Sequence, residues 1–260
     1  FVHPYTPLRD ALTDEAARLV ACNSAKGERF LPVGRQIDAR ALVNAVVALL
    51  ASGGSTNHGL HLPAIARAAG YELTWEDFAA LSAVVPLLAR VYPNGSADVN
   101  QFQAAGGPGW LIRELLGAGL LHGDVPTVAG EGLAAYCREP WLEEGRLAWR
   151  DLPEQSPAED IVRSAAAPFA QESGLQLLSG NLGRAMVKTS AVAPAYWQVR
   201  APALVFDSEA AVHQAYAAGL LQGDLVLVVR FQGPRANGMP ELHKLMPLLV
   251  NLQRNGQKVA

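Results

Sequence analysis

The spacing of apolar residues changes near residue 155 of this chain, and this change constrains the fold more than any single motif does. Before that point, apolar residues recur every three to four positions, which is the period of an amphipathic helix. We predict helices over residues 39–51, from about 55 to 69, from Thr74 to near Pro86, and over 110–116. Pro63 is expected in the first turn of its helix, because a proline deeper in a helix costs about 3 kcal/mol.

Residues 151–157, Asp-Leu-Pro-Glu-Gln-Ser-Pro, are typical of a boundary segment. After it, short runs rich in apolar residues indicate strands, and two helical stretches alternate with the later ones. The expected strands cover residues 175–178, 185–189, 203–206 and 225–231, and the expected helices cover 208–221 and 241–254. This order of elements predicts a mixed α/β fold.

The composition limits the class of partner. Half of the 260 residues are hydrophobic and 17% are charged, which suits a globular enzyme. The formal net charge is −3 and the basic residues form no stripe, so we expect no nucleic-acid partner. No apolar run approaches the roughly 18 residues that span a bilayer, so we expect no membrane partner. The two cysteines, Cys22 and Cys137, cannot form a disulfide framework, which favours ordinary thiols in a reducing, cytoplasmic setting.

Residues 53–58, Gly-Gly-Ser-Thr-Asn-His, lie just before a predicted helix. Free backbone N–H groups and the positive end of the helix dipole favour an anion at such a position. The Ser, Thr and Asn side chains could add hydrogen bonds to a phosphate, a carboxylate or a hydroxyl. On local sequence alone, a plain turn between two helices with a polar cap is the favoured interpretation of the same residues.

Two further loops have the same ambiguity. The glycines of residues 105–109 permit positive φ and fit a structural turn. Residues 232–241 follow an apolar strand, and loops at the carboxyl ends of strands bind ligands in open α/β folds. There, Arg235 and Asn237 could contact an anion or could be solvated, and Glu241 could simply complement a helix dipole. No Walker loop or GxGxxG motif is present, so a nucleotide site is not indicated.

Several long motifs, spread over nearly the whole chain, resemble the dihydroxy-acid and 6-phosphogluconate dehydratase superfamily. The motifs typical of the whole superfamily are residues 53–57, 61–66 and 115–124. The motifs typical of its 6-phosphogluconate branch are residues 7–13, 92–95, 179–184 and 237–245. Residues 107–110 depart from the usual Gly-Val-Pro of the family, which leaves the shape of that loop open.

The resemblance implies a hydro-lyase that converts 6-phospho-D-gluconate to 2-dehydro-3-deoxy-6-phospho-D-gluconate in the Entner–Doudoroff pathway. It implies a cytoplasmic homodimer with a [4Fe-4S] cluster that acts as a Lewis acid on the C3 hydroxyl, and with Mg²⁺ or Mn²⁺. The implied architecture is a helix-rich α/β N-terminal domain, of which residues 1–155 are a part. A boundary at 156–173 and the first part of a smaller β-barrel-like C-terminal domain, over 174–260, would follow.

By the same resemblance, Glu241 matches the glutamate that binds magnesium in related sugar-acid dehydratases. The residues expected to bind substrate are Gly54, Ser55, Thr56, Asn57, His58, Lys188, Thr189, Arg235 and Asn237. The family's cluster cysteines lie in Cys-Asp-Gly and Gly-Thr-Cys motifs, which are expected upstream. The serine base of an Asp-Gly-Arg-x-Ser-Gly segment is expected beyond Ala260. We therefore expect an internal fragment that is inactive by itself, without catalytic or cluster residues of its own.

Two alternatives stay open. The whole protein could dehydrate another sugar acid or a 2,3-dihydroxy acid, or the chain could be a non-catalytic, anion-binding remnant. Residues 237–245 favour the 6-phosphogluconate branch, because other branches usually carry a Gly-Gly-Pro-Gly-Met loop there.

Overall fold

The structure is a computed structural model that describes residues 2–238 and 242–260. The chain forms two compact units, of which the first ends at Ala191 and the second begins at Val192. Each unit has an apolar core of its own, and each is therefore described by itself. Among the described residues, no helix combines the length and the apolar character that crossing a bilayer requires.

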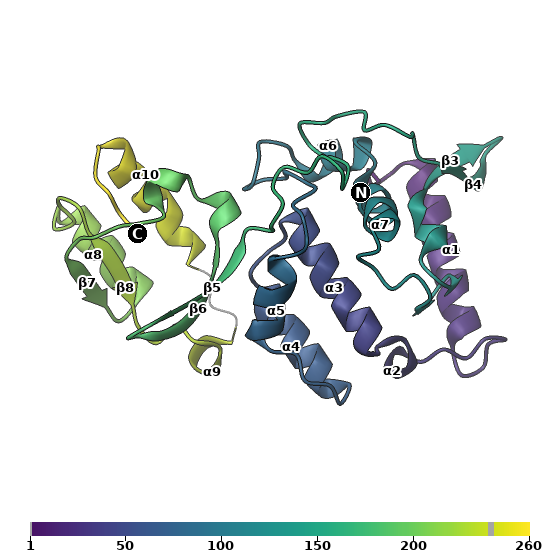
Figure 1. The fold of residues 1–260 in the computed structure, drawn as a ribbon, viewed down its shortest axis with the longest axis horizontal. Coiled ribbons are helices and arrows are strands. Elements are labelled where there is room, and N and C mark those ends of the chain that lie inside the picture. Colours follow the sequence, from purple (N-terminus) through teal and green to yellow (C-terminus); the bar gives the residue numbers. More distant parts are fainter. Residues whose placement is uncertain (1, 239–241) are drawn as a thin grey trace. The chain divides into compact units, whose positions relative to one another are not determined.

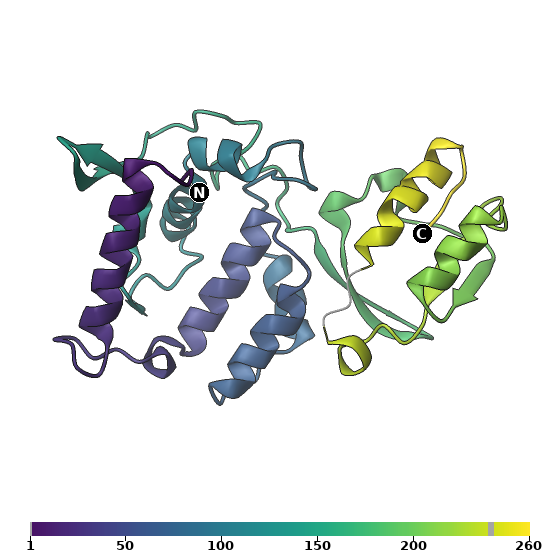
Figure 2. The same cartoon turned by 180° about the vertical axis from the view of Figure 1, so that it is seen from behind.

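Helices dominate the first unit. They are α1 (Pro7–Asn23), α2 (Val33–Gln36), α3 (Ala39–Ser52), α4 (His58–Ala68), α5 (Trp75–Ser82), α6 (Val99–Ala104) and α7 (Gly107–Gly117). Figures 1 and 2 show α3 between the α4–α5 pair and α7. Its apolar side chains fill the centre of the core together with Phe78 of α5 and Trp110 of α7, which are 0% and 1% exposed.

The strands of the first unit form three antiparallel pairs. They are β1 (Pro126–Thr127) with β2 (Gly130–Glu131), β3 (Arg138–Glu143) with β4 (Arg146–Asp151), and β5 (Leu175–Gly180) with β6 (Gly183–Lys188). Two short 3₁₀ helices, η1 (Ala134–Cys137) and η2 (Thr189–Ala191), complete the unit. The β5–β6 hairpin packs on α5, and an ion pair between Arg184 and Glu76 joins the two.

Residues 87–89 pair with the predicted boundary region and join it to the core of the first unit. Ala89 pairs with Val162 and Leu87 pairs with Ala170, both antiparallel. Val162 is fully buried. Residues of the 156–173 segment therefore pack in the first unit, and the position of the domain boundary in the whole protein stays a prediction.

The second unit is a small α/β arrangement. It contains η3 (Pro194–Tyr196), β7 (Ala203–Phe206), α8 (Glu209–Ala217), β8 (Val226–Val229), α9 (Pro234–Asn237), η4 (His243–Leu245) and α10 (Met246–Arg254). Strands β7 and β8 are parallel, and α8 forms the crossover between them, as parallel strands require. Apolar residues of α8 and α10 close the core around Leu225, which is 1% exposed.

The mixed α/β class and most of the predicted elements are confirmed. Asp38 caps α3 by accepting from the Ala41 N–H at 2.8 Å, and Thr74 forms a capping box with Asp77. Strand β7 has the predicted bounds, and β8 lies within the predicted 225–231 run. The sheets of the described residues are two-stranded and none closes into a barrel.

The prediction for Pro63 is wrong, because α4 begins at His58 and Pro63 lies in its second turn. A proline there cannot donate to the carbonyl oxygen of Gly59, four residues earlier. Instead, the indole Nε1–H of Trp75 in α5 donates to that oxygen at 3.0 Å. A tertiary hydrogen bond therefore replaces the missing helical one, which makes the deeper position tolerable.

Candidate functional site

A small pocket of the first unit brings together two of the residues expected to bind substrate, Gly54 and Lys188. The pocket is lined by Leu49, Leu50, Gly53, Gly54, Gly174, Leu175, Lys188 and Ser190. Its volume is about 10 Å³, close to the space that one water-sized group needs. These residues lie at or just after the end of α3, at or just before the start of β5, at the end of β6 and in η2.

The turn at Gly53 and Gly54 ends α3 and forms one wall of the pocket. Gly53 has a φ of 60°, and its N–H caps α3 by donating to Leu49 and Leu50 carbonyl oxygens. A Cβ at Gly53 would also collide with Nδ2 of Asn94. Glycine is required here by the left-handed conformation and by close packing, so the conformation needs no ligand to explain it.

Asn94 connects this turn to the opposite wall of the pocket. Its Nδ2 donates to the Gly53 carbonyl oxygen at 2.6 Å, and its Oδ1 accepts from Ser190 Oγ at 2.8 Å. Both polar ends of one amide are therefore engaged, and they join segments that are 41 and 96 residues away from Asn94 in the sequence. The Asn94 side chain thus fixes the width of the pocket.

Lys188 is the last residue of β6 and Thr189 is the first residue of η2, where the backbone leaves the hairpin. Lys188 pairs with Leu175 in the β5–β6 register. The Thr189 N–H and Oγ1 both donate to the Gly174 carbonyl oxygen, at 2.6 and 3.0 Å. Burial lowers the pKa of the Lys188 ammonium below its usual value, because desolvation disfavours the charged form.

The predicted anion loop continues from Gly54 into α4. The N–H groups of His58 and Gly59 donate to the carbonyl oxygens of Ser55 and Thr56 at 3.2 and 2.9 Å. Ser55 Oγ accepts from the Asn57 N–H at 3.2 Å, and His58 Nδ1 lies 3.1 Å from the Ser55 carbonyl oxygen. These donors are used within the turn, so the observed arrangement is a turn that satisfies its own donors, with Ser55, Thr56 and His58 exposed.

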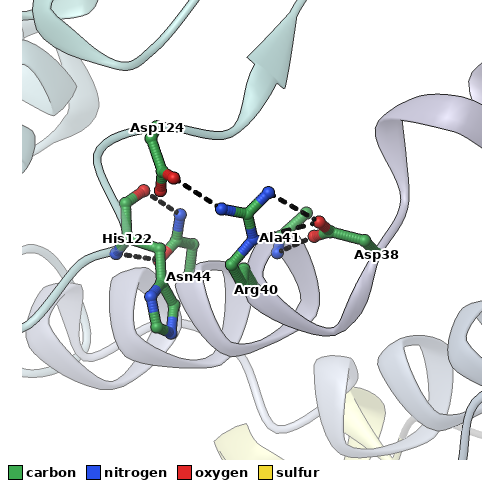
Figure 3. A network of polar contacts seen from close by, with 6 residues as sticks. All are labelled: Asp38, Arg40, Ala41, Asn44, His122 and Asp124. Carbon is green, nitrogen blue, oxygen red and sulfur yellow. Dashed lines mark hydrogen bonds and ion pairs between the residues drawn. The ribbon is translucent and has the colours of Figure 1, made fainter.

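A polar network holds the other end of α3, opposite to the Gly53 turn (Figure 3). The Asn44 side chain donates to the His122 carbonyl oxygen at 2.9 Å and accepts from the His122 N–H at 2.8 Å. Arg40 forms ion pairs with Asp38 at 3.2 Å and with Asp124 at 2.6 Å. The motif at residues 115–124 thus anchors α3 through its backbone and one carboxylate.

The remaining predicted residues belong to the second unit. Arg235 and Asn237 lie in α9, and Asn237 Nδ2 donates to the Phe231 carbonyl oxygen at 2.9 Å and to Gln232 Oε1 at 3.0 Å. Glu241, the expected magnesium ligand, lies outside the described residues. The substrate-binding role of these residues stays a prediction.

Neither cysteine has the surroundings of a cluster ligand. Cys22 lies in α1 and Cys137 in η1, and burial raises the pKa of the Cys137 thiol, which disfavours the thiolate that iron needs. Among residues 2–238 and 242–260, no group of three or more His, Cys, Asp or Glu side chains is placed to hold a metal ion. The residues described here therefore do not fit an iron–sulfur cluster.

The sequence reasoning did not select Asn94, Gly174 or Ser190 as site residues. Asn94 was noted within a family motif, and Ser190 follows Thr189 directly. Their roles depend on contacts between segments remote in sequence, which no local pattern encodes. The one available signal was the place of Asn94 in a family motif, where its side chain had no assigned partner.

Comparisons with known proteins place the whole chain among dehydratases. Residues 1–136 match the family described as dihydroxy-acid/6-phosphogluconate dehydratase N-terminal, and residues 160–260 match the corresponding C-terminal family.

Individual relatives are similar over the full chain. It is 59% identical over 260 residues to a phosphogluconate dehydratase of Pseudomonas aeruginosa and 58% identical to one of Escherichia coli K12. A dihydroxy-acid dehydratase of Acaryochloris marina is 38% identical over 207 residues, which is 78% of this chain and 34% of that relative. The chain spans 43% of the length of each of the first two relatives.

Proposed function

Because the chain belongs to the dihydroxy-acid/6-phosphogluconate dehydratase family, we propose that the whole protein dehydrates 6-phospho-D-gluconate. The product would be 2-dehydro-3-deoxy-6-phospho-D-gluconate, as in the Entner–Doudoroff pathway. One observation carries the proposal: identity to named phosphogluconate dehydratases is 58–59% over all 260 residues, against 38% over 207 residues for a dihydroxy-acid dehydratase.

The proposed reaction removes a proton from C2 and hydroxide from C3, which together leave as water. The enol that results becomes the 2-keto acid when a proton from water is added at C3 and the enol hydroxyl gives its proton to water. For this reaction, the acid must be held with its C2 proton and C3 hydroxyl correctly oriented. We assign the binding of one end of the acid to the pocket at Gly54 and Lys188, with Thr189 and the loop at residues 55–58 beside it.

The proposal also assigns roles to three residues that follow Val192. Arg235 and Asn237 would contact the substrate, and Glu241 would bind Mg²⁺ or Mn²⁺. A [4Fe-4S] cluster is proposed for the whole protein, but the two cysteines of this chain do not fit its ligand set, so no step is assigned to it here. A cytoplasmic homodimer with a barrel-like C-terminal domain is proposed on the family resemblance.

The test is a turnover assay of the whole protein, purified and measured without oxygen. Three acids are compared: 6-phosphogluconate, gluconate and 2,3-dihydroxy-3-methylbutanoate. We expect the highest kcat/KM for 6-phosphogluconate. Turnover of either non-phosphorylated acid, with none of 6-phosphogluconate, would show that the substrate assignment is wrong.

A further inference from the structure

We propose that Lys188 binds the carboxylate of the sugar acid and not its phosphate. The inference rests on the proposed function, and it states which group of the substrate binds in the pocket at Gly54. It depends on the contacts of Lys188, on the charge and size of the pocket, and on the chemistry of the reaction.

Among the residues that the structure describes, no carboxylate forms an ion pair with Lys188. The chain has four lysines, and the other three, at positions 26, 244 and 258, are exposed, whereas Lys188 is half-buried. The eight ion pairs of the described residues all use arginine, and none reaches Lys188. Burial also lowers the pKa of this ammonium, so an anion beside it would restore interactions that it has lost with water.

The charge of the pocket matches a single carboxylate. Lys188 is the one charged residue among the eight that line it, and the others are leucines, glycines and Ser190. A phosphate monoester carries a charge of about −1.5 to −2 at neutral pH and is commonly met by arginine clusters. One ammonium in an apolar wall therefore suits a carboxylate better.

The size of the pocket agrees with this choice. Its volume of about 10 Å³ admits one water-sized group. This space can take one oxygen of a carboxylate beside Lys188, and it is too small to enclose the three terminal oxygens of a phosphate without widening. Widening is opposed by Asn94, which holds Gly53 and Ser190 together through bonds of 2.6 and 2.8 Å.

The reaction gives a cation at the carboxylate a further role. When the C2 proton leaves, negative charge develops on the carboxylate oxygens, and a fixed positive charge there stabilises the transition state. A cation at the phosphate, far from the reacting carbons, would strengthen binding alone. Loss of Lys188 should therefore lower kcat as well as raise KM.

The test compares the whole protein with its Lys188→Met variant, and the exposed Lys26→Met is the matched control. Dissociation constants are measured by calorimetry for gluconate, which lacks the phosphate, and for glucitol 6-phosphate, which lacks the carboxylate. We expect Lys188→Met to weaken gluconate binding by about tenfold or more and to change glucitol 6-phosphate binding by less than about twofold. Lys188→Arg keeps the charge and should retain more of the gluconate affinity, and Lys26→Met should change neither constant.

The opposite selectivity, with only glucitol 6-phosphate weakened, would overturn the inference, and so would equal loss of both ligands or of neither. If Lys188→Met does not fold, as seen by circular dichroism, then Lys188→Gln, which also removes the charge, takes its place, and unchanged gluconate affinity in that variant would overturn the inference. Turnover of 6-phosphogluconate by the unmodified protein is scored separately. If the unmodified protein turns over 6-phosphogluconate but Lys188→Met does not selectively lose gluconate affinity, only the role of Lys188 is refuted.

Discussion

Replacing Trp75 with phenylalanine should destabilise the chain by an amount that depends on Pro63. The Trp75 indole Nε1–H donates to the Gly59 carbonyl oxygen at 3.0 Å, and Gly59 is buried. Since Pro63 has no N–H, the helical donor four residues after Gly59 is missing from α4. The variant therefore leaves a buried carbonyl without a partner, which costs about 1–3 kcal/mol, in addition to the packing lost with the smaller ring.

A double-mutant cycle separates the two contributions. Pro63→Ala supplies an N–H four residues after Gly59, so Trp75→Phe should cost less in that background, by about 1 kcal/mol. The packing loss is the same in both backgrounds and cancels. The free energy of unfolding of the four proteins is measured in urea by circular dichroism. Additivity within about 0.3 kcal/mol would refute the idea that the two residues share one acceptor.

Further predictions concern the pocket and the thiols. Gly53→Ala should cost more than about 1–2 kcal/mol in unfolding free energy, because strain at φ 60° adds to a collision with Asn94, whereas Gly70→Ala, at φ 85° in open space, should cost the strain alone. An equal loss would contradict this. The lowered pKa of Lys188 means that the unfolded chain binds more protons as pH approaches the usual lysine value of about 10.4, so stability should rise with pH there. Lys188→Met should reduce this increase in unfolding free energy by less than about 1 kcal/mol. At pH 7 the variant should be as stable as the unmodified chain, and a loss of stability there would indicate that Lys188 has a structural role. Cys137, whose pKa is raised by burial, should react with iodoacetamide more slowly than an unperturbed thiol, and equal rates would be inconsistent with its placement. The isolated 260-residue chain should bind no iron or sulfide, and stoichiometric amounts of both would show that cluster ligands lie within it.

Helices with capping residues at their ends and apolar residues at helical spacing could be predicted from the sequence. Asp38, Thr74 and Gly53 mark helix ends through local chemistry, so α3 and the start of α5 followed directly. Helix α1 was missed, although Thr6 caps it and Pro7 occupies its first turn. Its apolar residues do recur with a helical period, since Leu8, Ala11, Leu12 and Leu19 are all partly buried on one face, so the sequence contained the signal for this helix.

The candidate site was predictable in part. The glycine turn stood out by composition, and Lys188 was found through resemblance. The bonds from Asn94 to Gly53 and Ser190 join distant segments, and the sequence contains no periodic signal for them. A proline inside a helix does remove a backbone donor, as expected for Pro63. The donor that replaces it, the Trp75 indole, could not be identified from the sequence, because it depends on how α5 lies against α4.

The most direct test of the central claim is the product that the whole protein forms from 6-phosphogluconate in D₂O under anaerobic conditions. Loss of the C2 proton and the C3 hydroxyl, followed by protonation of the enol, predicts a 2-keto-3-deoxy acid with one solvent deuterium at C3, visible by ¹H NMR. A product without deuterium at C3, or no consumption of the acid by an enzyme loaded with its cofactors, would contradict the account.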